Sequence, residues 1–409
     1  MATEATTVAV PDRRQRYREF MKRFNPAAPA MAAIRDGLIC QSPGRSVAKR
    51  IAARADLSPG CQQLLVGGIG SGKTTELMLA EIALKSQAAV LPLFVDVSAE
   101  TDLNQLQHGA LLCIVGIHLW MNINPKYKVP PQVRAAAIAI QRAAFGRRVS
   151  IADEELNLTA EIVAGEPDSL SQQAEGKLIA PVAPTKVDVV DLLESVGILV
   201  HYLNQKQREV IVIFDGLDRL KKADEFWTIV DQDLHAIKSL KLSLVAAGPL
   251  SIMYGPGRQI KDYFDEVYYL GPAIFDPDES DFLLEIMRLR GAGEFMSEAQ
   301  SLRLCRFSGG VVRDLISLAR NAGENAYLAN RDHINSSDVD EAIQRIGISY
   351  LLGLGTEQRK LLHGILQGRG FSPTDSVSLD LLLSRRVLEQ DGSKYQVHPA
   401  LASVLNGGF

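Results

Sequence analysis

One short loop, residues 67–74, joins four glycines to a lysine and a threonine in the order GGIGSGKT. Its spacing fits the pattern G-x-x-x-x-G-K-[ST], and the defining positions are Gly67, Gly72, Lys73 and Thr74. Glycines let consecutive backbone N–H groups turn inward around a polyphosphate. The lysine brings a positive charge to the β- and γ-phosphates, and the threonine hydroxyl is a ligand for Mg²⁺. The loop therefore predicts a fold that presents phosphate-binding backbone at a tight turn.

The residues on either side of the loop support this interpretation. Gln62–Val66 is a short apolar run, as expected of a buried parallel strand, and Thr75–Lys85 has the pattern of a helix. The loop would then lie at a helix N-terminus, where the dipole and unpaired N–H groups favour an anion. The alternative is a glycine-rich turn that binds nothing, which the strand–loop–helix order disfavours. The predicted phosphate-contacting residues are Gly67, Gly68, Ile69, Gly70, Ser71, Gly72, Lys73, Thr74 and Thr75.

Composition sets broad limits on the chain. Its 409 residues suggest two or three domains, and 46% hydrophobic with 22% charged residues is ordinary for a globular protein. The net charge of −4 gives no general argument for nucleic-acid binding. The four cysteines form no C-x-x-C pair, so neither a zinc site nor a disulfide framework is indicated. We expect reduced thiols in a cytoplasmic protein, with no signal peptide and no membrane-spanning segment.

The N-terminal segment is locally basic, and Asp12 to Phe24 has the pattern of a helix. The cations are Arg13, Arg14, Arg16, Arg18, Lys22 and Arg23. We interpret them as the solvated face of that helix, and a nucleic-acid or membrane patch is the alternative.

Strand and helix signals alternate after the loop. Further strands are predicted at 89–97, 208–214, 242–247 and 266–270, with helices at 103–120 and 187–204. This alternation predicts a doubly wound parallel sheet, an α/β fold. Residues 121–186 interrupt the rhythm with six prolines, and we interpret them as an insertion at the rim of the sheet.

Beyond Pro272 the pattern becomes helical. Helices are predicted at 279–290, 297–307, 311–329 and 337–346, followed by helices at 356–367 and 376–386 and a β-hairpin formed by 387–389 and 394–398. Two helices and a hairpin suggest a winged helix. The expected domains are a basic helical extension at 1–36, a phosphate-binding core at 37–271, a helical lid at 272–347 and a winged helix-turn-helix at 348–409.

Two acids follow the clearest strand, 208–214, in the order Asp215-Gly-Leu-Asp218. Asp215 has the position of a Walker B aspartate, which holds Mg²⁺, and Asp218 is placed to orient an attacking water. The alternatives are a turn-capping aspartate and a helix N-terminal charge. Gly216 stands where a catalytic glutamate usually follows the first acid, so slow turnover is expected.

Arginines provide weaker candidates for the same reaction. Arg313 lies one turn into a helix that follows two glycines, and it could reach the γ-phosphate from the lid. Arg258 and Lys261 lie between the last two strands, where a cation can act in trans on a neighbouring subunit's nucleotide. A surface or helix-capping arginine is the alternative for Arg313.

These residues together resemble the AAA+-related ATPases of the origin-recognition (ORC/Cdc6-like) and STAND groups, bacterial type. The resemblance covers roughly residues 37–409 and implies that Lys73, Thr74 and Asp215 bind Mg²⁺ and ATP, with Thr74 and Asp215 as the metal ligands. It also implies that Asp218 is the downstream acid and that Arg313 is the sensor-2 arginine. ATP is chosen from the resemblance and because the chain has no guanine-reading N-K-x-D motif.

The sequence departs from this pattern at several places. STAND motifs often carry a further acid where this chain has Arg219, and Ser251 is a weak sensor-1 candidate because no asparagine is evident in 246–251. The chain has neither a long repeat sensor nor a fused effector, so an effector would be a separate protein.

The leading hypothesis is a slowly hydrolysing, ATP-dependent molecular switch that assembles with itself, as a homo-oligomer, or with a partner, as in bacterial defence systems. The alternatives are a DNA-acting ATPase (replication initiator, helicase loader or transposition regulator) and a nucleotide-bound scaffold without useful hydrolysis. The predicted recognition helix presents Ser376, Ser378 and Asp380 early and Arg385 and Arg386 at its end. That face is only weakly basic, whereas a DNA-binding surface is strongly basic.

Overall fold

The computed structural model describes residues 12–42, 44–123, 129–145, 189–206, 208–220, 222–254, 260–275, 282–390 and 394–407. They form two compact units. The sheet unit consists of the described parts of Ser46–Gly67 and Lys73–Leu270. The helical unit consists of the described parts of Met1–Arg45 and Gly271–Phe409 together with the loop Gly68–Gly72. The four-domain division expected from the sequence stays a prediction.

A parallel sheet organises the sheet unit. Its strands, in the described part of the chain, lie in the order β2-β3-β4-β1-β5, and every neighbouring pair is parallel. Their bounds are β1 (Gln62–Gly67), β2 (Val90–Asp96), β3 (Glu209–Asp215), β4 (Ser243–Gly248) and β5 (Glu266–Leu270). Because parallel strands end at the same edge, the loop after β1 and the carboxylates ending β2 and β3 share that edge.

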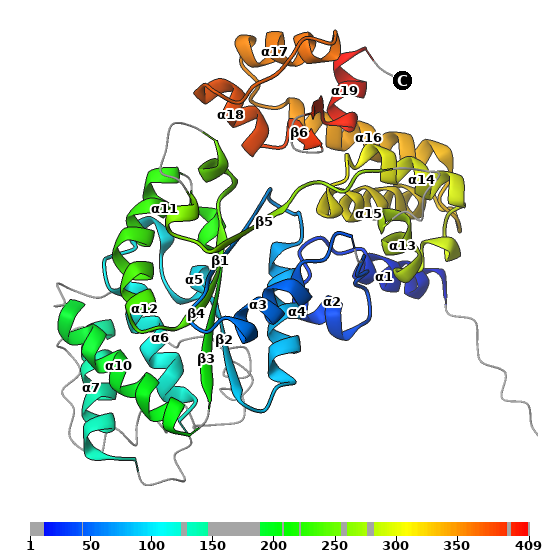
Figure 1. Cartoon of the computed structure of the whole chain (residues 1–409). Helices are drawn as coiled ribbons and strands as arrows, with labels where there is room; N and C mark the ends of the chain where they lie inside the picture. Colours follow the sequence, from blue (N-terminus) through cyan, green and yellow to red (C-terminus); the bar gives the residue numbers. More distant parts are fainter. Residues whose placement is uncertain are drawn as a thin grey trace, which may run out of the picture. The chain divides into compact units, whose positions relative to one another are not determined.

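Helices cover both faces of the sheet, as the apolar strands require (Figure 1). Residues Ile211 and Ile213 pack on the side of α3 (Ala48–Leu57) and α4 (Lys73–Lys85). The alternate residues of β3 pack on the other side, among helices α6 (Ala110–Met121), α10 (Val189–Gln205), α11 (Ala223–Ile229) and α12 (His235–Ser239). Helix α7 (Pro131–Phe145) packs against α6 and α10. The strand alternation thus divides the core into two layers.

The helix predicted at 103–120 is broken in the structure. A 3-10 turn, η1 (Leu103–Gln105), comes first, and α6 begins only at Ala110. Gly109 has a φ of 88°, and the buried carboxylate of Asp233 accepts the N–H groups of Gly109 and Leu111. A side-chain cap from a distant segment therefore sets the start of the helix. The remainder of the predicted insertion includes α7, and residues 146–188 lie outside the described residues.

Short elements connect the larger ones. They are α5 (Val97–Glu100), η2 (Leu217–Arg219), the π-helical turn η3 (Val230–Leu234), η4 (Leu250–Met253), η5 (Ile260–Asp262) and η6 (Ala292–Glu294). Of these, η2 continues directly from β3 through Gly216 and so carries Asp218 past the end of the sheet.

The helical unit contains the predicted lid helices and two N-terminal ones. They are α1 (Arg13–Arg23), α2 (Ala30–Arg35), α13 (Phe282–Leu289), α14 (Glu298–Phe307), α15 (Val312–Leu328) and α16 (Ser336–Leu351). Phe20 and Phe24 are buried in the same core as Phe295. Half of the basic residues of α1 contact the unit instead of facing solvent: Arg13 and Arg16 lie over aromatic rings, and Arg23 pairs with Glu294. The predicted solvated face is therefore partly wrong.

The C-terminal elements follow the order predicted for a winged helix. They are α17 (Thr356–Leu366), α18 (Ser376–Leu383), the antiparallel strands β6 (Val387–Gln390) and β7 (Lys394–Val397), and α19 (Pro399–Leu405). Helix α18 ends at Leu383, three residues before the predicted end at 386. The reason is local, since Arg385 has a φ of 62°, which does not continue a right-handed helix.

Candidate phosphate-binding site

The loop between β1 and α4 has the backbone that its glycines predict. Gly70 and Gly72 have φ values of 81° and 104°, a region that residues with a side chain rarely adopt. Ser71 N–H bonds the Gly68 carbonyl at 3.2 Å, which closes the turn. The Arg45 side chain, which lies outside the loop in sequence, donates to the Ser71 carbonyl at 3.2 Å and so stabilises the loop conformation. Helix α4 begins at Lys73, so the loop leads directly into a helix N-terminus, which favours an anion.

Lys73 is the buried cation of the site. Its side chain is 5% exposed, and its Nζ lies 2.8 Å from the Gly67 carbonyl and 2.8 Å from Asp218 Oδ2. The sequence separates Lys73 and Asp218 by the whole of β2 and β3, and the sheet brings them into contact. The two predicted residues thus form one ion pair.

Asp215 ends β3 beside the start of α4 and is only 2% exposed. The Thr74 hydroxyl hydrogen-bonds to it. Burial raises the pKa of this carboxyl, and the nearby charges of Asp218 and Asp96 raise it further. A hydroxyl and a carboxylate in contact are the oxygen donors that Mg²⁺ uses beside a nucleotide, so these two residues fit the predicted metal.

Two acids at this edge were missed by the sequence reasoning. Asp96 ends β2 in register with Asp215 and accepts hydrogen bonds from the backbone and hydroxyl of Ser98. Glu76, in the first turn of α4, accepts from Ser46 and from the first N–H groups of α3. An acid at the end of the predicted strand 89–97 was a usable signal for Asp96. Glu76 had none, because its partners are fixed by helix packing.

Two serines near the strand ends have buried hydroxyls. Among the described residues, Ser71 Oγ in the loop and Ser251 Oγ in η4 have no hydrogen-bond partner. Ser251 follows β4 and is 5% exposed. Buried hydroxyls normally find a partner, so each is available to an incoming polar ligand.

The arginine candidates have different outcomes. Arg313 is exposed in the first turn of α15, in the helical unit. Arg258 lies outside the described residues, so its predicted role is not examined by the structure. Lys261 is exposed in η5.

Arg385 and Arg386 do not face solvent as a recognition helix would require. Arg386 donates to the carbonyls of Tyr350 and Leu352, and Arg385 pairs with Asp314 at 2.9 Å.

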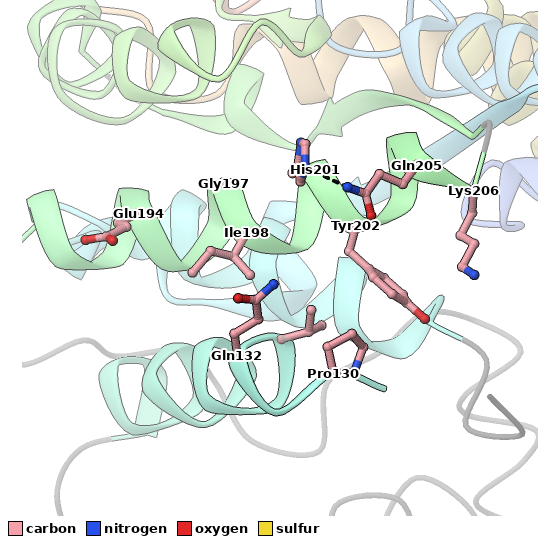
Figure 2. Close-up of a pocket in the computed structure, with 10 residues that line it drawn as sticks. Pro130, Gln132, Glu194, Gly197, Ile198, His201, Tyr202, Gln205 and Lys206 are labelled. Carbon is pink, nitrogen blue, oxygen red and sulfur yellow. Dashed lines mark hydrogen bonds between the residues drawn. The ribbon is translucent and has the colours of Figure 1, made fainter. Parts of the chain in front are cut away.

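A separate cavity lies between α7 and α10 (Figure 2). Its volume is about 640 Å³. Gln132 and Pro130 lie opposite Ile198 and Tyr202 across it. Gln205 hydrogen-bonds His201 at 2.8 Å on its wall. Its lining contains no residue of the loop 67–75 and no end of a sheet strand. It is therefore not the predicted phosphate site.

No protein-family model and no curated protein sequence matches this chain. Among solved structures, the chain is similar to the RuvB Holliday junction branch migration motor of Thermotoga maritima, with 14% identity, a TM-score of 0.38 and coverage of 88% of this chain and 93% of that one. It is also similar to Cdc6p of Pyrobaculum aerophilum, with 15% identity, a TM-score of 0.42 and coverage of 94% and 97%. A Drosophila ORC structure bound to DNA shows 13% identity, a TM-score of 0.42 and coverage of 97% and 93%.

None of the helices in the described ranges is long and apolar enough to cross a membrane. The fold class rests on the sheet itself. The strands are parallel, the glycine-rich loop joins β1 to α4, and Asp215 ends β3 beside it. The sequence-based prediction of an α/β P-loop fold built on a parallel sheet is therefore confirmed.

Proposed function

We propose that this chain binds Mg²⁺ and ATP at residues 67–75 and hydrolyses the nucleotide slowly, as a molecular switch. Two contacts at neighbouring positions support this proposal. Lys73 pairs with Asp218, and the Thr74 hydroxyl hydrogen-bonds to Asp215. These four side chains supply a cation, two metal ligands and a second carboxylate, which are groups of the kinds that phosphoryl transfer uses. Lys73 neutralises the β- and γ-phosphates, Thr74 and Asp215 hold the metal, and Asp218 orients water.

Slow turnover is supported by the residue after Asp215. Gly216 has a φ of 89°, and a Cβ there would lie 2.9 Å from Asp96 Oδ1. A glutamate at this position would require a disfavoured backbone and would place its side chain against a carboxylate. The backbone conformation and the crowding by Asp96 therefore disfavour an adjacent catalytic acid, and Asp218 would act alone.

Arg313 is proposed as the residue that reads the γ-phosphate. A Cβ built on Gly70 would lie 2.7 Å from Arg313 Cβ, so the backbone of α15 closely approaches the loop within the helical unit. An arginine there would bind the terminal phosphate of ATP and lose its ligand on hydrolysis. The lid would then respond to the state of the nucleotide.

The output of the switch is proposed to be assembly, either with a second copy or with a separate effector protein. A role in a bacterial defence system is proposed from the resemblance to STAND ATPases. The inward orientation of Arg385 and Arg386 supports a protein contact over a DNA contact for the C-terminal elements. Size analysis with a non-hydrolysable ATP analogue, with DNA in one arm, separates these outputs: a DNA-dependent shift would favour the DNA-acting alternative.

The binding experiment is a titration of Mg²⁺ and ATP into the wild type, Lys73→Ala and Lys85→Ala by calorimetry. Lys85 is a matched control because it is also a lysine of α4 but is 58% exposed at the end of the helix. We expect Lys73→Ala to weaken binding by on the order of tenfold or more, as loss of a charge-assisted contact predicts, and Lys85→Ala to bind like wild type. Equal affinity in all three proteins would overturn the proposal.

A further inference from the structure

Arg385 has an unusual backbone conformation for a residue other than glycine. It follows α18 and precedes β6, and its φ is 62°. This conformation is disfavoured for a residue with a side chain, so the surrounding contacts must hold it. Such strained positions concentrate at functional sites, and the contacts of Arg385 indicate which function it has.

A buried carboxylate fixes the guanidinium of Arg385. Its Nη1 lies 2.9 Å from Oδ1 of Asp314, whose side chain is 8% exposed. Tyr350 donates its hydroxyl to the other oxygen of the same carboxylate, and His398 Nε2 lies 3.3 Å from it. Burial would raise the pKa of Asp314, but His398 and Arg385 together with Tyr350 lower it, so the carboxylate stays charged. The buried, ionised carboxylate of Asp314 therefore fixes the position of the Arg385 guanidinium.

The same guanidinium is next to the phosphate-binding loop. A Cβ built on Gly70 would lie 3.5 Å from Nη1 of Arg385, and both residues belong to the helical unit. Gly70 is the turn at which the loop's N–H groups would surround a phosphate. Arg385 has five N–H donors, and in the described part of the chain the hydrogen bond that its guanidinium makes comes from Nη1. Nη1 carries two N–H groups, so the nitrogen that bonds Asp314 has a second donor 3.5 Å from the Cβ position of Gly70.

Arg386 provides an internal comparison. Its Nε and Nη2 donate to the backbone carbonyls of Tyr350 and Leu352 at 2.9 and 2.7 Å, and its side chain is 16% exposed. Two adjacent arginines thus have different tasks. Arg386 binds the carbonyls at the C-terminal end of α16, whereas Arg385 is held against an ionised carboxylate beside Gly70.

We propose that Arg385 is a second arginine for the nucleotide's phosphates, with Asp314 as its positioning residue. The ligand class is a nucleoside triphosphate, and the contact is with the terminal phosphate held by the loop around Gly70. An arginine suits this task because its planar fork binds phosphate oxygens through two parallel hydrogen bonds. This inference rests on the proposed function and extends it, because the C-terminal elements would then respond directly to the γ-phosphate.

The test compares a non-hydrolysable ATP analogue with ADP, both with Mg²⁺, in the full chain. Calorimetry gives the ratio of the two affinities for the wild type, Arg385→Ala, Arg385→Lys and Arg386→Ala. We expect Arg385→Ala to weaken the ATP analogue by on the order of tenfold and ADP by much less, as a lost charge-assisted contact predicts. Arg385→Lys should restore part of the ratio, and Arg386→Ala should keep the wild-type ratio.

A purely structural role for Arg385 gives a different result. Both affinities would then fall together, or neither would change, and the wild-type ratio in Arg385→Ala would overturn the inference. If Arg385→Ala fails to fold, Arg385→Lys and Asp314→Asn take its place, and an unchanged ratio in both would overturn it. If the wild type binds neither nucleotide, the proposed function fails instead, so the two failures are distinguishable.

Discussion

The Nζ of Lys73 lies 2.8 Å from Oδ2 of Asp218, and the two side chains are 5% and 17% exposed. The lysine that is proposed to bind phosphate is thus already neutralised by the acid that is proposed to orient water. An incoming polyphosphate must share or displace this carboxylate, since both anions use the same ammonium group. The pair therefore links nucleotide binding to the position of the hydrolytic acid.

Asp218→Asn is expected to separate binding from hydrolysis. The amide keeps the shape of the side chain but no longer neutralises Lys73, so affinity for Mg²⁺ and ATP should be kept or increase a few-fold, which corresponds to about 1 kcal/mol. Turnover should fall by on the order of a hundredfold, because the water loses its base. Calorimetry and phosphate release measure the two quantities. Asp224→Asn, an exposed acid in the first turn of α11, is the control and should behave like wild type in both. Turnover equal to wild type in Asp218→Asn would exclude its catalytic role.

The affinity for Mg²⁺ should depend on pH through the ionisation of the Asp215 carboxyl. Its pKa is raised above 3.8 by burial and by the nearby acids. A raised pKa favours the protonated form in the fold, so Asp215 contributes stability fully below pH 3.8 and loses it as the pH rises through the folded pKa. Mg²⁺ requires the ionised form, so its affinity should fall as the pH drops through the same range. Fluorescence titration of Mg²⁺ with a nucleotide analogue, at several values between about pH 4 and pH 7, measures this. The control, Asp224→Asn, should follow the wild-type profile, and an affinity that is constant down to pH 3.8 would contradict the prediction.

Gly216→Glu should not produce a faster ATPase. The new side chain would be placed on a backbone with a φ of 89° and would meet Asp96 Oδ1 within 2.9 Å of its Cβ. We expect turnover to decrease and the thermal midpoint to fall, since strain of this kind costs roughly 1–3 kcal/mol. Steady-state phosphate release and a melting curve check both. A Gly370→Ala variant is a control for glycine loss alone, because Gly370 lies outside the proposed site and has no atom within 4 Å of a built Cβ. Increased turnover in Gly216→Glu would contradict the steric argument.

Asp314→Ala should strongly destabilise the helical unit. The substitution leaves Arg385 and Tyr350 without their shared acceptor and removes the carboxylate that lies 3.3 Å from the fully buried His398. Breaking a buried ion pair in this way costs about 3–5 kcal/mol in the free energy of unfolding. Asp332→Ala is the control, since Asp332 is 66% exposed and its pair with Arg13 should contribute at most about 1 kcal/mol. Urea denaturation of both variants measures the difference, and equal losses would show that the cluster around Asp314 adds little.

Phe20→Ala should show that α1 belongs to the core of the helical unit. Phe20 is 1% exposed, and its ring lies 4.5 Å from that of Phe24 and 4.7 Å from that of Phe295. Truncating a buried phenylalanine costs about 3–5 kcal/mol. Arg18→Ala, on the exposed side of the same helix, should change stability by less than about 0.5 kcal/mol. Both are measured by urea denaturation. A small effect of Phe20→Ala would mean that α1 is a loosely attached extension.

Local patterns made much of the fold predictable. The apolar run before Gly67 and the run ending at Phe214 became β1 and β3 nearly as predicted, because a strand buried on both faces must be apolar throughout. The glycine spacing of 67–74 and the acids at Asp215 and Asp218 marked the candidate site. Each signal lies within a few neighbouring residues, which is why one sequence was sufficient.

Contacts between distant segments could not be predicted in this way. Nothing near Gly109 indicates that Asp233 starts α6 there, and nothing near Arg385 indicates that Asp314 turns it inward. The sequence by itself determined that a phosphate loop lies between a strand and a helix and that acids end a later strand. Only the tertiary structure decided that Lys73 meets Asp218 and that Arg385 meets Asp314, because packing of elements far apart in the chain chooses the partner of each buried charge.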